Sequence, residues 1–411
     1  MSRILVISVG GSCEPVVNAC RELKPDFVYF FCSGGPKGSS LTVDGPGNPC
    51  GDTRKAIVYQ LGLQPDTFAK IEVVDPDDLN ACYKAVREVS AEITARFGPD
   101  AEVVANYTGG TKTMSVALAL FAIIEGNWSL TLNKGPRRDL VKVRAGDMPV
   151  LVGKQAVALT LLRNQAREFL KHYAYDMADA VLAQATVNQL LSGSYQNELL
   201  RARRLCQAFH SWDVFDHVRA LELLQVTGGK RCAPFIEALL DISGKGRATG
   251  YEQVVDLIFN AHRRAAQGRY DDCVARLYRA LEMLAQVRLQ KEWGIETGNV
   301  ELAKLPEHLR GQYSQLADAD GRIRLPLRKA YDLLAELGDP VGRLWQESQR
   351  PIVAALEGRN SSILAHGVQP LHRENYETYA AVIEGFIRQV LETLGVKTRC
   401  RQLPREELLE M

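Results

Sequence analysis

Two patterns of apolar residues divide this chain. In the first 150 residues, short apolar runs alternate with segments in which apolar residues recur every three or four positions. Helices are predicted over Asp78–Phe97 and Thr113–Glu125. The short runs are rich in Val, Ile and Phe, as buried parallel strands are, and comprise Ile4–Val9, Val28–Cys32, Ile71–Val74, Val103–Ala105 and Leu130–Leu132. The alternation predicts a doubly wound α/β sheet.

Beyond about residue 155 the apolar pattern has the period of an α-helix. The strand pair Trp128–Leu132 and Leu140–Val143, joined by the turn NKGPRRD, is expected to end the α/β region. The Gly- and Ser-bearing run Ser243–Gly250 divides the helical part. Its predicted helices are Ala156–Leu191, Asn197–Leu224, Gln253–Gln267, Asp271–Trp293, Leu325–Leu337 and Tyr376–Leu394. We predict an α/β domain over 1–150, a helical connector over 151–248, an all-α domain over 249–398 and a frayed tail over 399–411.

The composition is that of an ordinary soluble globular protein, with 46% hydrophobic and 24% charged residues. Fifty basic and 49 acidic residues nearly cancel, so no global basic field indicates nucleic acid, although a local patch remains possible. The nine scattered cysteines include no Cys-x-x-Cys pair, which argues against a structural zinc site and a disulfide framework. The start MSRILVISVGGS has no signal-peptide layout, and the run SVALALFAII is about half a membrane span. We expect a cytoplasmic protein with no membrane segment.

Three glycine-bearing segments follow predicted strands and are candidate ligand contacts. Ligands of open α/β sheets bind beyond the carboxyl ends of the strands, where glycine lets backbone N–H groups approach a phosphate. The alternative is that the glycines only turn the chain, since neither GxGxxG nor GxxxxGK[ST] is present. The candidate residues are Gly10, Gly11, Ser12, Ser33, Gly34, Asn106, Thr108, Gly109, Gly110, Thr111 and Lys112.

The third of these segments, NYTGGTKTMS, carries the most information. Gly109 and Gly110 make a tight turn, Thr108 and Thr111 offer hydroxyls, and Lys112 offers a cation where a helix begins. A turn needed only for packing does not require two threonines and a lysine. A separate Gly- and Pro-rich stretch, residues 33–53, is either a flexible lid over a ligand or a disordered insertion.

The loop after Asn106 resembles the signature loop of CARF domains, which are Rossmann-like sensors of cyclic oligoadenylate in type III CRISPR systems. The loop from Gly10 to Ser12 lies where that family has its other ligand-facing loop. The resemblance covers roughly residues 1–150. It implies a Rossmann-like CARF domain that binds a cyclic oligoadenylate of four or six adenylates.

In the segment RNSSILAHG, Arg359 and His366 are separated by six residues. The spacing alone is weak, because Arg167 with His172, and Arg203 or Arg204 with His210, also match it. Those upstream matches lie in continuous helical patterns, and we interpret them as solvated helix faces.

The context of the downstream match is different. An apolar stretch, Pro351–Leu356, is expected to end at Gly358, after which Asn360, Ser361 and Ser362 are able to cap a new turn. Ile363 and Leu364 are expected to anchor that turn in a core, and Gly367 to close it. Helical residues seven apart fall about 20° apart around the axis, so both side chains share one face. The alternative is a capped helix end on the surface.

RNSSILAHG resembles the Arg-x(4–6)-His motif of HEPN ribonucleases, including Asn360 after the arginine and Gly367 after the histidine. HEPN domains are helical bundles with this motif near their C-terminal end. The resemblance implies that Arg359, Asn360 and His366 are catalytic. Arg279 and Glu282 in RLYRALEMLAQ are either a support for that segment, as the family implies, or an i,i+3 ion pair on a helix flank.

CARF followed by HEPN is the architecture of the CARF–HEPN ribonucleases of type III CRISPR defence. The resemblance implies a homodimeric, cyclic-oligoadenylate-activated endoribonuclease that cleaves single-stranded RNA. An imidazole suits the proton transfer and a guanidinium the phosphate charge. No Asp/Glu/His cluster with metal-ligand spacing lies near the segment RNSSILAHG, so no metal or other cofactor is expected. Two alternatives are a sensor without nuclease activity and an enzyme acting in the first domain, such as a ring nuclease or nucleotide hydrolase. For the latter, Ser12, Thr108 and Lys112 are the candidate groups.

Overall fold

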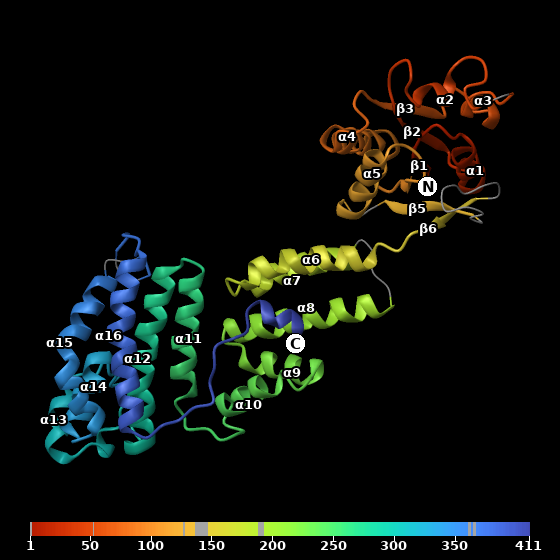
Figure 1. Cartoon of the computed structure of the whole chain (residues 1–411). Helices are drawn as coiled ribbons and strands as arrows, with labels where there is room; N and C mark the ends of the chain where they lie inside the picture. The colour runs from red at the N-terminus through yellow and green to blue at the C-terminus, as the bar shows by residue number, and fades with distance from the viewer. Residues whose placement is uncertain are drawn as a thin grey trace. The chain divides into compact units, whose positions relative to one another are not determined.

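A computed structural model of the chain describes residues 2–51, 53–125, 128–135, 147–187, 193–360, 363–364 and 367–411, with the backbone alone at 357–360. Two compact units are present (Figure 1). The first comprises Met1–Arg163 and Ala183–Glu198, and the second comprises Asn164–Leu182 and Leu199–Met411. No helix in the described ranges is long and apolar enough to cross a membrane.

A six-stranded sheet organises the first unit. Its strands are β1 (Arg3–Ser8), β2 (Phe27–Ser33), β3 (Phe68–Val73), β4 (Glu102–Asn106), β5 (Ser129–Lys134) and β6 (Met148–Leu151). The order is β3-β2-β1-β4-β5-β6, with all neighbours parallel except β5 and β6. The predicted parallel strands are therefore confirmed. The antiparallel partner of β5 is β6, whereas the expected partner Leu140–Val143 lies outside the described residues.

Helices cover both faces of this sheet because successive strand residues point to opposite sides. On β1, Ile4 and Val6 pack with α4 (Leu79–Phe97) and α5 (Lys112–Ile124). Leu5 and Ile7 instead pack on the other face. That face is covered by α1 (Glu14–Leu23), α2 (Ser40–Asp44) and α3 (Ile57–Leu61). This is the predicted doubly wound arrangement (Figure 1).

A disulfide joins Cys13, just after the first glycine loop, to Cys50 in the long Gly- and Pro-rich segment. Their Cα atoms are 5.6 Å apart. One disulfide is thus present in a chain whose sequence argued against a disulfide framework. The long segment also contains α2, whose Val43 is fully buried, so its described part is not a disordered insertion. The flexible lid over a ligand stays a prediction.

The remainder of the described chain is helical, as predicted. α6 (Gln155–Leu170), α7 (Tyr175–Val187) and α8 (Gly193–Asp213) contribute to both units. The second unit continues with α9 (His217–Thr227), α10 (Ala233–Ile242), α11 (Glu252–Ala266), α12 (Tyr270–Trp293), α13 (Glu307–Ser314), α14 (Leu327–Glu336), α15 (Pro340–Asn360) and α16 (Arg373–Thr393).

Two predicted helices are broken in the structure. Ala156–Leu191 is interrupted at Tyr173 and Asn197–Leu224 at Phe215, where φ is +56° and +69°. Both aromatic rings are packed, Tyr173 being buried beneath the guanidinium of Arg405. Tertiary packing thus overrides the helical period at these positions. The prediction of a frayed tail is also wrong, because Leu408 and Leu409 are buried.

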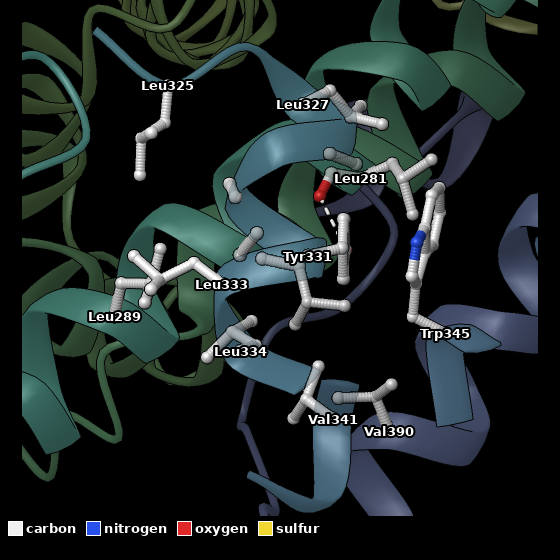
Figure 2. Close-up of a cluster of buried hydrophobic side chains, with 14 of the residues drawn as sticks. Leu281, Leu289, Leu325, Leu327, Tyr331, Leu333, Leu334, Val341, Trp345 and Val390 are labelled. Atoms are coloured by element: carbon white, nitrogen blue, oxygen red, sulfur yellow. Dashed lines mark hydrogen bonds between the residues drawn. The ribbon is translucent and has the colours of Figure 1, made fainter. Parts of the chain in front are cut away.

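The largest core of the second unit lies among α11, α12, α14, α15 and α16. At its centre the Tyr331 ring stacks on Trp345 with centroids 4.4 Å apart. The Tyr331 hydroxyl donates to the carbonyl of Leu281 at 2.8 Å (Figure 2). Burial of this hydroxyl therefore leaves no unmet donor, which lets a tyrosine occupy an otherwise apolar core.

Candidate functional site

The sheet brings the candidate ligand loops together. Because β2, β1 and β4 are parallel neighbours, the loops that follow them meet at one edge of the sheet. A Cβ on Gly10 would lie 2.9 Å from the Gly110 nitrogen, and a Cβ on Gly109 would lie 2.4 Å from the Ser8 carbonyl oxygen. The two loops therefore touch through their backbones, and glycine is required at both.

The two threonine hydroxyls are already engaged within the domain. The Thr108 hydroxyl donates to Asn106 Oδ1 at 2.7 Å and accepts from the Asn133 backbone N–H at 2.8 Å. The Thr111 hydroxyl donates to the Pro76 carbonyl at 2.6 Å and caps α5 by accepting from the Met114 N–H. The argument that packing alone would not need these threonines is therefore wrong, although their role toward a ligand stays a prediction.

A buried network of polar side chains supports the loop that follows β4. Most of this network was missed from the sequence. Asn106 Nδ2 donates to Asn133 Oδ1 at 2.9 Å, and Asn133 Nδ2 donates to Asp147 Oδ2 at 3.0 Å. Asn18 on α1 donates to the other oxygen of Asp147. Polar side chains inside the apolar β5 segment were the available signal, since Asn133 points inward from a strand.

The remaining candidates differ in how open they are. Gly11, Ser12 and Lys112 are exposed at the loop edge, and the space around a Gly11 Cβ is empty. Ser33 is engaged instead, because its hydroxyl accepts from the Ser39 N–H at 2.9 Å. Gly34 is tied to β3 through a bond from its N–H to the Val73 carbonyl at 2.9 Å. Lys112 and the backbone around Gly11 are thus the best placed for an outside ligand.

A thiol also lies near this edge. Burial raises the pKa of Cys32, the residue before Ser33, to about 12, with a smaller contribution from Glu72. The thiol is therefore neutral at physiological pH, and a neutral thiol is a poor nucleophile. Cys32 offers no thiolate to an enzymatic reaction at the loops.

The C-terminal motif begins at the end of α15. This helix runs without a break through Gly358 to Asn360, so the expected helix end at Gly358 is wrong. Arg359 and Asn360 are its last two residues and not the start of a new turn. Ser361, Ser362 and His366 lie outside the described residues. The distance between Arg359 and His366 and their relative orientation are therefore not described either.

The apolar residues inside the motif are exposed. Ile363 is 66% and Leu364 46% accessible, and Val368 just beyond is 86% accessible. The expectation that Ile363 and Leu364 anchor the motif in a core is therefore wrong for a single subunit. No core within the described part of the chain covers them.

Arg279 and Glu282 form the ion pair that their spacing predicts. Arg279 Nη1 lies 2.6 Å from Glu282 Oε2 and donates to Gln286 Oε1 at 2.9 Å. The supporting role toward the motif stays a prediction, because His366 lies outside the described residues.

The two upstream Arg–His matches make surface contacts within the second unit. Arg167 pairs with Glu410 at 2.9 Å, and His172 Nδ1 lies 2.9 Å from the Ala266 carbonyl. Arg203 pairs with Asp179 at 2.8 Å. His172 and Arg204 are nevertheless exposed, and 39% of the Arg167 side chain is accessible, as the interpretation as solvated faces expects. Arg203 is the more enclosed member, with 22% of its side chain accessible.

The C-terminal region matches a known family. Residues 245–390 match the family model described as the Csm6 HEPN domain. These residues are therefore similar in sequence to the HEPN domain of Csm6. The match begins near the predicted start at residue 249 and confirms the all-α HEPN expectation.

Whole-chain comparison extends this result to the fold of the complete chain. The structure of Enterococcus italicus Csm6 bound to cyclic hexa-2′-fluoro-hexa-dAMP matches with a TM-score of 0.66 and 14% identity, covering 100% of this chain and 98% of that one. At this identity the likeness shows the fold. Protein VC1899 from Vibrio cholerae matches at 13% identity over 72% of this chain and 70% of its own, but its TM-score of 0.26 carries no argument. None of the curated proteins matches the sequence.

Together the family match and the fold confirm the resemblance to CARF–HEPN ribonucleases of type III CRISPR systems. The HEPN domain follows an α/β domain of the expected type, in the expected order. In the described ranges, no group of three or more His, Cys, Asp or Glu side chains is placed to hold a metal ion.

Proposed function

We propose that this protein is a CRISPR-associated, cyclic-oligoadenylate-activated, metal-independent endoribonuclease that cleaves single-stranded RNA. The observation that carries the proposal is the Csm6 HEPN match over residues 245–390, in a chain whose full length shares the fold of Csm6. The sensor and the nuclease are then separate domains of one chain.

The chemistry is assigned to the motif at the end of α15. His366 moves the proton of the attacking ribose 2′-hydroxyl, because an imidazole titrates near neutral pH. Arg359 stabilises the charge that develops on the phosphate, since a guanidinium contacts two oxygens at once. Asn360 orients the phosphate or the imidazole. The products are a 2′,3′-cyclic phosphate and a 5′-hydroxyl.

The activator site is assigned to the loops at the sheet edge. The E. italicus Csm6 structure contains a cyclic hexanucleotide analogue, and this chain presents Gly11, Ser12 and Lys112 openly where its parallel strands end. Lys112 is also the first residue of α5, where the helix dipole favours an anion. A cyclic oligoadenylate is the ligand that this arrangement supports best.

A homodimer is supported by apolar residues that one subunit leaves exposed. Ile363 and Leu364 are uncovered within the nuclease motif itself. On α5, Val116, Leu120 and Ile124 are exposed at successive four-residue steps and so form one stripe. Contiguous exposed apolar residues of this kind mark interaction surfaces. A second copy covering both would pair two motifs into one composite nuclease site.

The experiment is an RNA cleavage assay with purified protein, performed with no activator, with cyclic tetraadenylate and with cyclic hexaadenylate, each with and without a chelator. Cleavage that needs one cyclic ligand and ignores the chelator is expected. Ligand binding without any cleavage would instead identify a sensor that acts through a partner. Consumption of the ligand without RNA cleavage would place the chemistry in the first domain.

A further inference from the structure

A pocket rich in arginine lies outside the motif, where the end of α8 meets α11 and α12. It has a volume of about 480 Å³ and four guanidinium groups in its lining. These belong to Arg264, Arg269, Arg276 and Arg279, and Asp213 is the only acidic residue lining it among those described. We call these four residues the arginine pocket.

Carboxylates neutralise this pocket only in part. Asp213 serves two arginines, Arg264 and the fully buried Arg263. Asp272 is likewise shared by Arg269, at 2.6 Å, and Arg276, at 2.9 Å. Glu282 pairs with Arg279 at 2.6 Å. Three carboxylates therefore face the four guanidinium groups, and one of the three, Asp213, also serves Arg263. Because each guanidinium has five N–H donors, donors remain for a further anion.

One buried donor has no acceptor. The Arg264 side chain is only 9% exposed, yet its Nε has no hydrogen-bond partner among the described residues. An unpaired buried donor on a charged group is costly, so buried guanidinium groups are normally satisfied. An anionic ligand in the pocket would supply further acceptors to the guanidinium groups that line it.

The pocket also continues along α12. Arg279 lines a second pocket of about 460 Å³ that includes Gln286, Gln290 and Lys291. From Arg279 to Lys291 the helix rises about 18 Å, which extends the row of donors past the arginine pocket. The acidic residues of the second pocket are already engaged, Asp241 by Arg399 and Glu252 by the Thr249 and Gly250 N–H groups.

We propose that the arginine pocket binds the phosphodiester backbone of the RNA substrate and guides the strand along α12. The phosphate chemistry follows from the pocket itself, and the identity of the strand rests on the proposed nuclease function. Guanidinium groups suit this task because they contact two phosphate oxygens at once and carry charge at every physiological pH.

Binding of a fluorescein-labelled 2′-O-methyl oligouridylate to the full-length protein, measured by anisotropy over a range of salt, tests this proposal. The 2′-O-methyl group keeps the backbone but blocks cleavage by the 2′-hydroxyl. Arg276→Ala and Arg269→Ala should each weaken binding several-fold and lower the slope of log affinity against log salt by roughly 0.7, the value for one phosphate contact on a single strand. Arg276→Lys should restore the slope, because the charge returns.

The matched control is Arg328→Ala on α14, an exposed arginine outside the pocket, which should leave the slope unchanged. Thermal melting monitors the fold. Arg276→Ala could melt early because its bonds to Asn260 and Asp272 are lost. In that case Arg269→Ala is the decisive variant, since Asp272 is the one side chain paired with Arg269 among the described residues.

Unchanged slopes in Arg269→Ala and Arg276→Ala would overturn the proposal, as would an equal loss in Arg328→Ala. Inorganic pyrophosphate is the second probe. If pyrophosphate binds in the pocket and the oligonucleotide does not, the pocket serves a small phosphoanion and the RNA assignment fails. A protein that binds the oligonucleotide through the pocket but cleaves no RNA would refute the nuclease function and leave the pocket standing. RNA cleavage together with unchanged salt slopes in the two variants would refute the role of the pocket and leave the nuclease function standing.

Discussion

The activator loops and the nuclease motif are built in opposite ways. At the sheet edge, the loops after β1 and β4 touch through glycine backbones and rest on the buried polar network of Asn106, Asn133 and Asp147. The motif at the end of α15 leaves Ile363 and Leu364 exposed. One subunit thus supplies a braced ligand surface but an uncovered nuclease segment. Under the proposed function, the contrast predicts that sensing is prepared within a subunit and that chemistry depends on assembly.

The strongest test of this contrast separates chemistry from sensing. His366→Ala should lower RNA cleavage by roughly 10²–10⁴-fold, the usual loss for a general acid or base, with activator affinity unchanged. Arg359→Lys should stay impaired, because an ammonium cannot make the two-oxygen contact. Cleavage rate and activator affinity are measured on the same protein. A twofold loss, or inactivation by His210→Ala in its place, would show that the motif is wrongly assigned.

The disulfide offers a test of how strongly the first unit is stabilised around its loops. Cys13–Cys50 spans 37 residues, so the chain-entropy model gives it about 4 kcal/mol of stabilisation of the first unit. Thermal melting with and without dithiothreitol measures the loss. Cys13→Ser is the control, because it should melt like the reduced protein and no longer respond to the reductant. Free thiols at both positions in the untreated native protein would show that the disulfide does not stabilise the first unit.

A pair of glycine substitutions tests the contact between the loops. Gly109→Ala would place a Cβ 2.4 Å from the Ser8 carbonyl, so overpacking should cost roughly 1–3 kcal/mol and weaken activator binding. Gly11→Ala meets nothing within 4 Å and should keep the stability of the parent protein. Chemical denaturation measures the stability of the two variants, and activator titration measures their affinity for the activator. Equal behaviour of the two variants would mean that the loops do not depend on close backbone approach.

The smallest expected effect concerns Lys112. The side chain of Lys112 is exposed. Lys112→Ala should therefore lower the affinity for the activator by roughly two- to fivefold, as expected for a solvent-exposed charge pair. The melting temperature should not change. Lys84→Ala on the surface of α4, where Lys84 pairs only with Glu88, is the control. An unaltered activation constant for Lys112→Ala would show that the loop backbone alone holds the ligand.

Local patterns predicted the fold well where local chemistry decides it. The strands follow from Val- and Ile-rich runs, and α4 and α5 begin next to the capping side chains of Asp78 and Thr111. The breaks at Tyr173 and Phe215 were missed because positive φ at an aromatic residue is imposed by distant packing. The helical period continues through both positions and gives no warning.

The candidate site shows the same division. Asn106, Gly109 and Lys112 stand in one motif and were found from it. Asn133 and Asp147 were missed because their partners are far along the chain, Asn18 being 129 residues from Asp147. The arginine pocket was missed for a different reason. Its members lie within residues 264–279, but their spacing gives no sign that the turn between α11 and α12 brings them to one pocket, and the overall charge of the chain is nearly neutral.

The buried tail sets an order of events during synthesis. The Tyr175 hydroxyl on α7 donates to the Pro404 carbonyl, 229 residues later, and Arg167 on α6 pairs with Glu410. At about 5–20 residues per second, the ribosome needs on the order of 10 to 50 seconds to deliver that acceptor. For this interval α6 and α7 lack part of their packing, while the sheet of the first unit already has all its strands. The nascent sensor can therefore fold well before the helices of the second unit are complete.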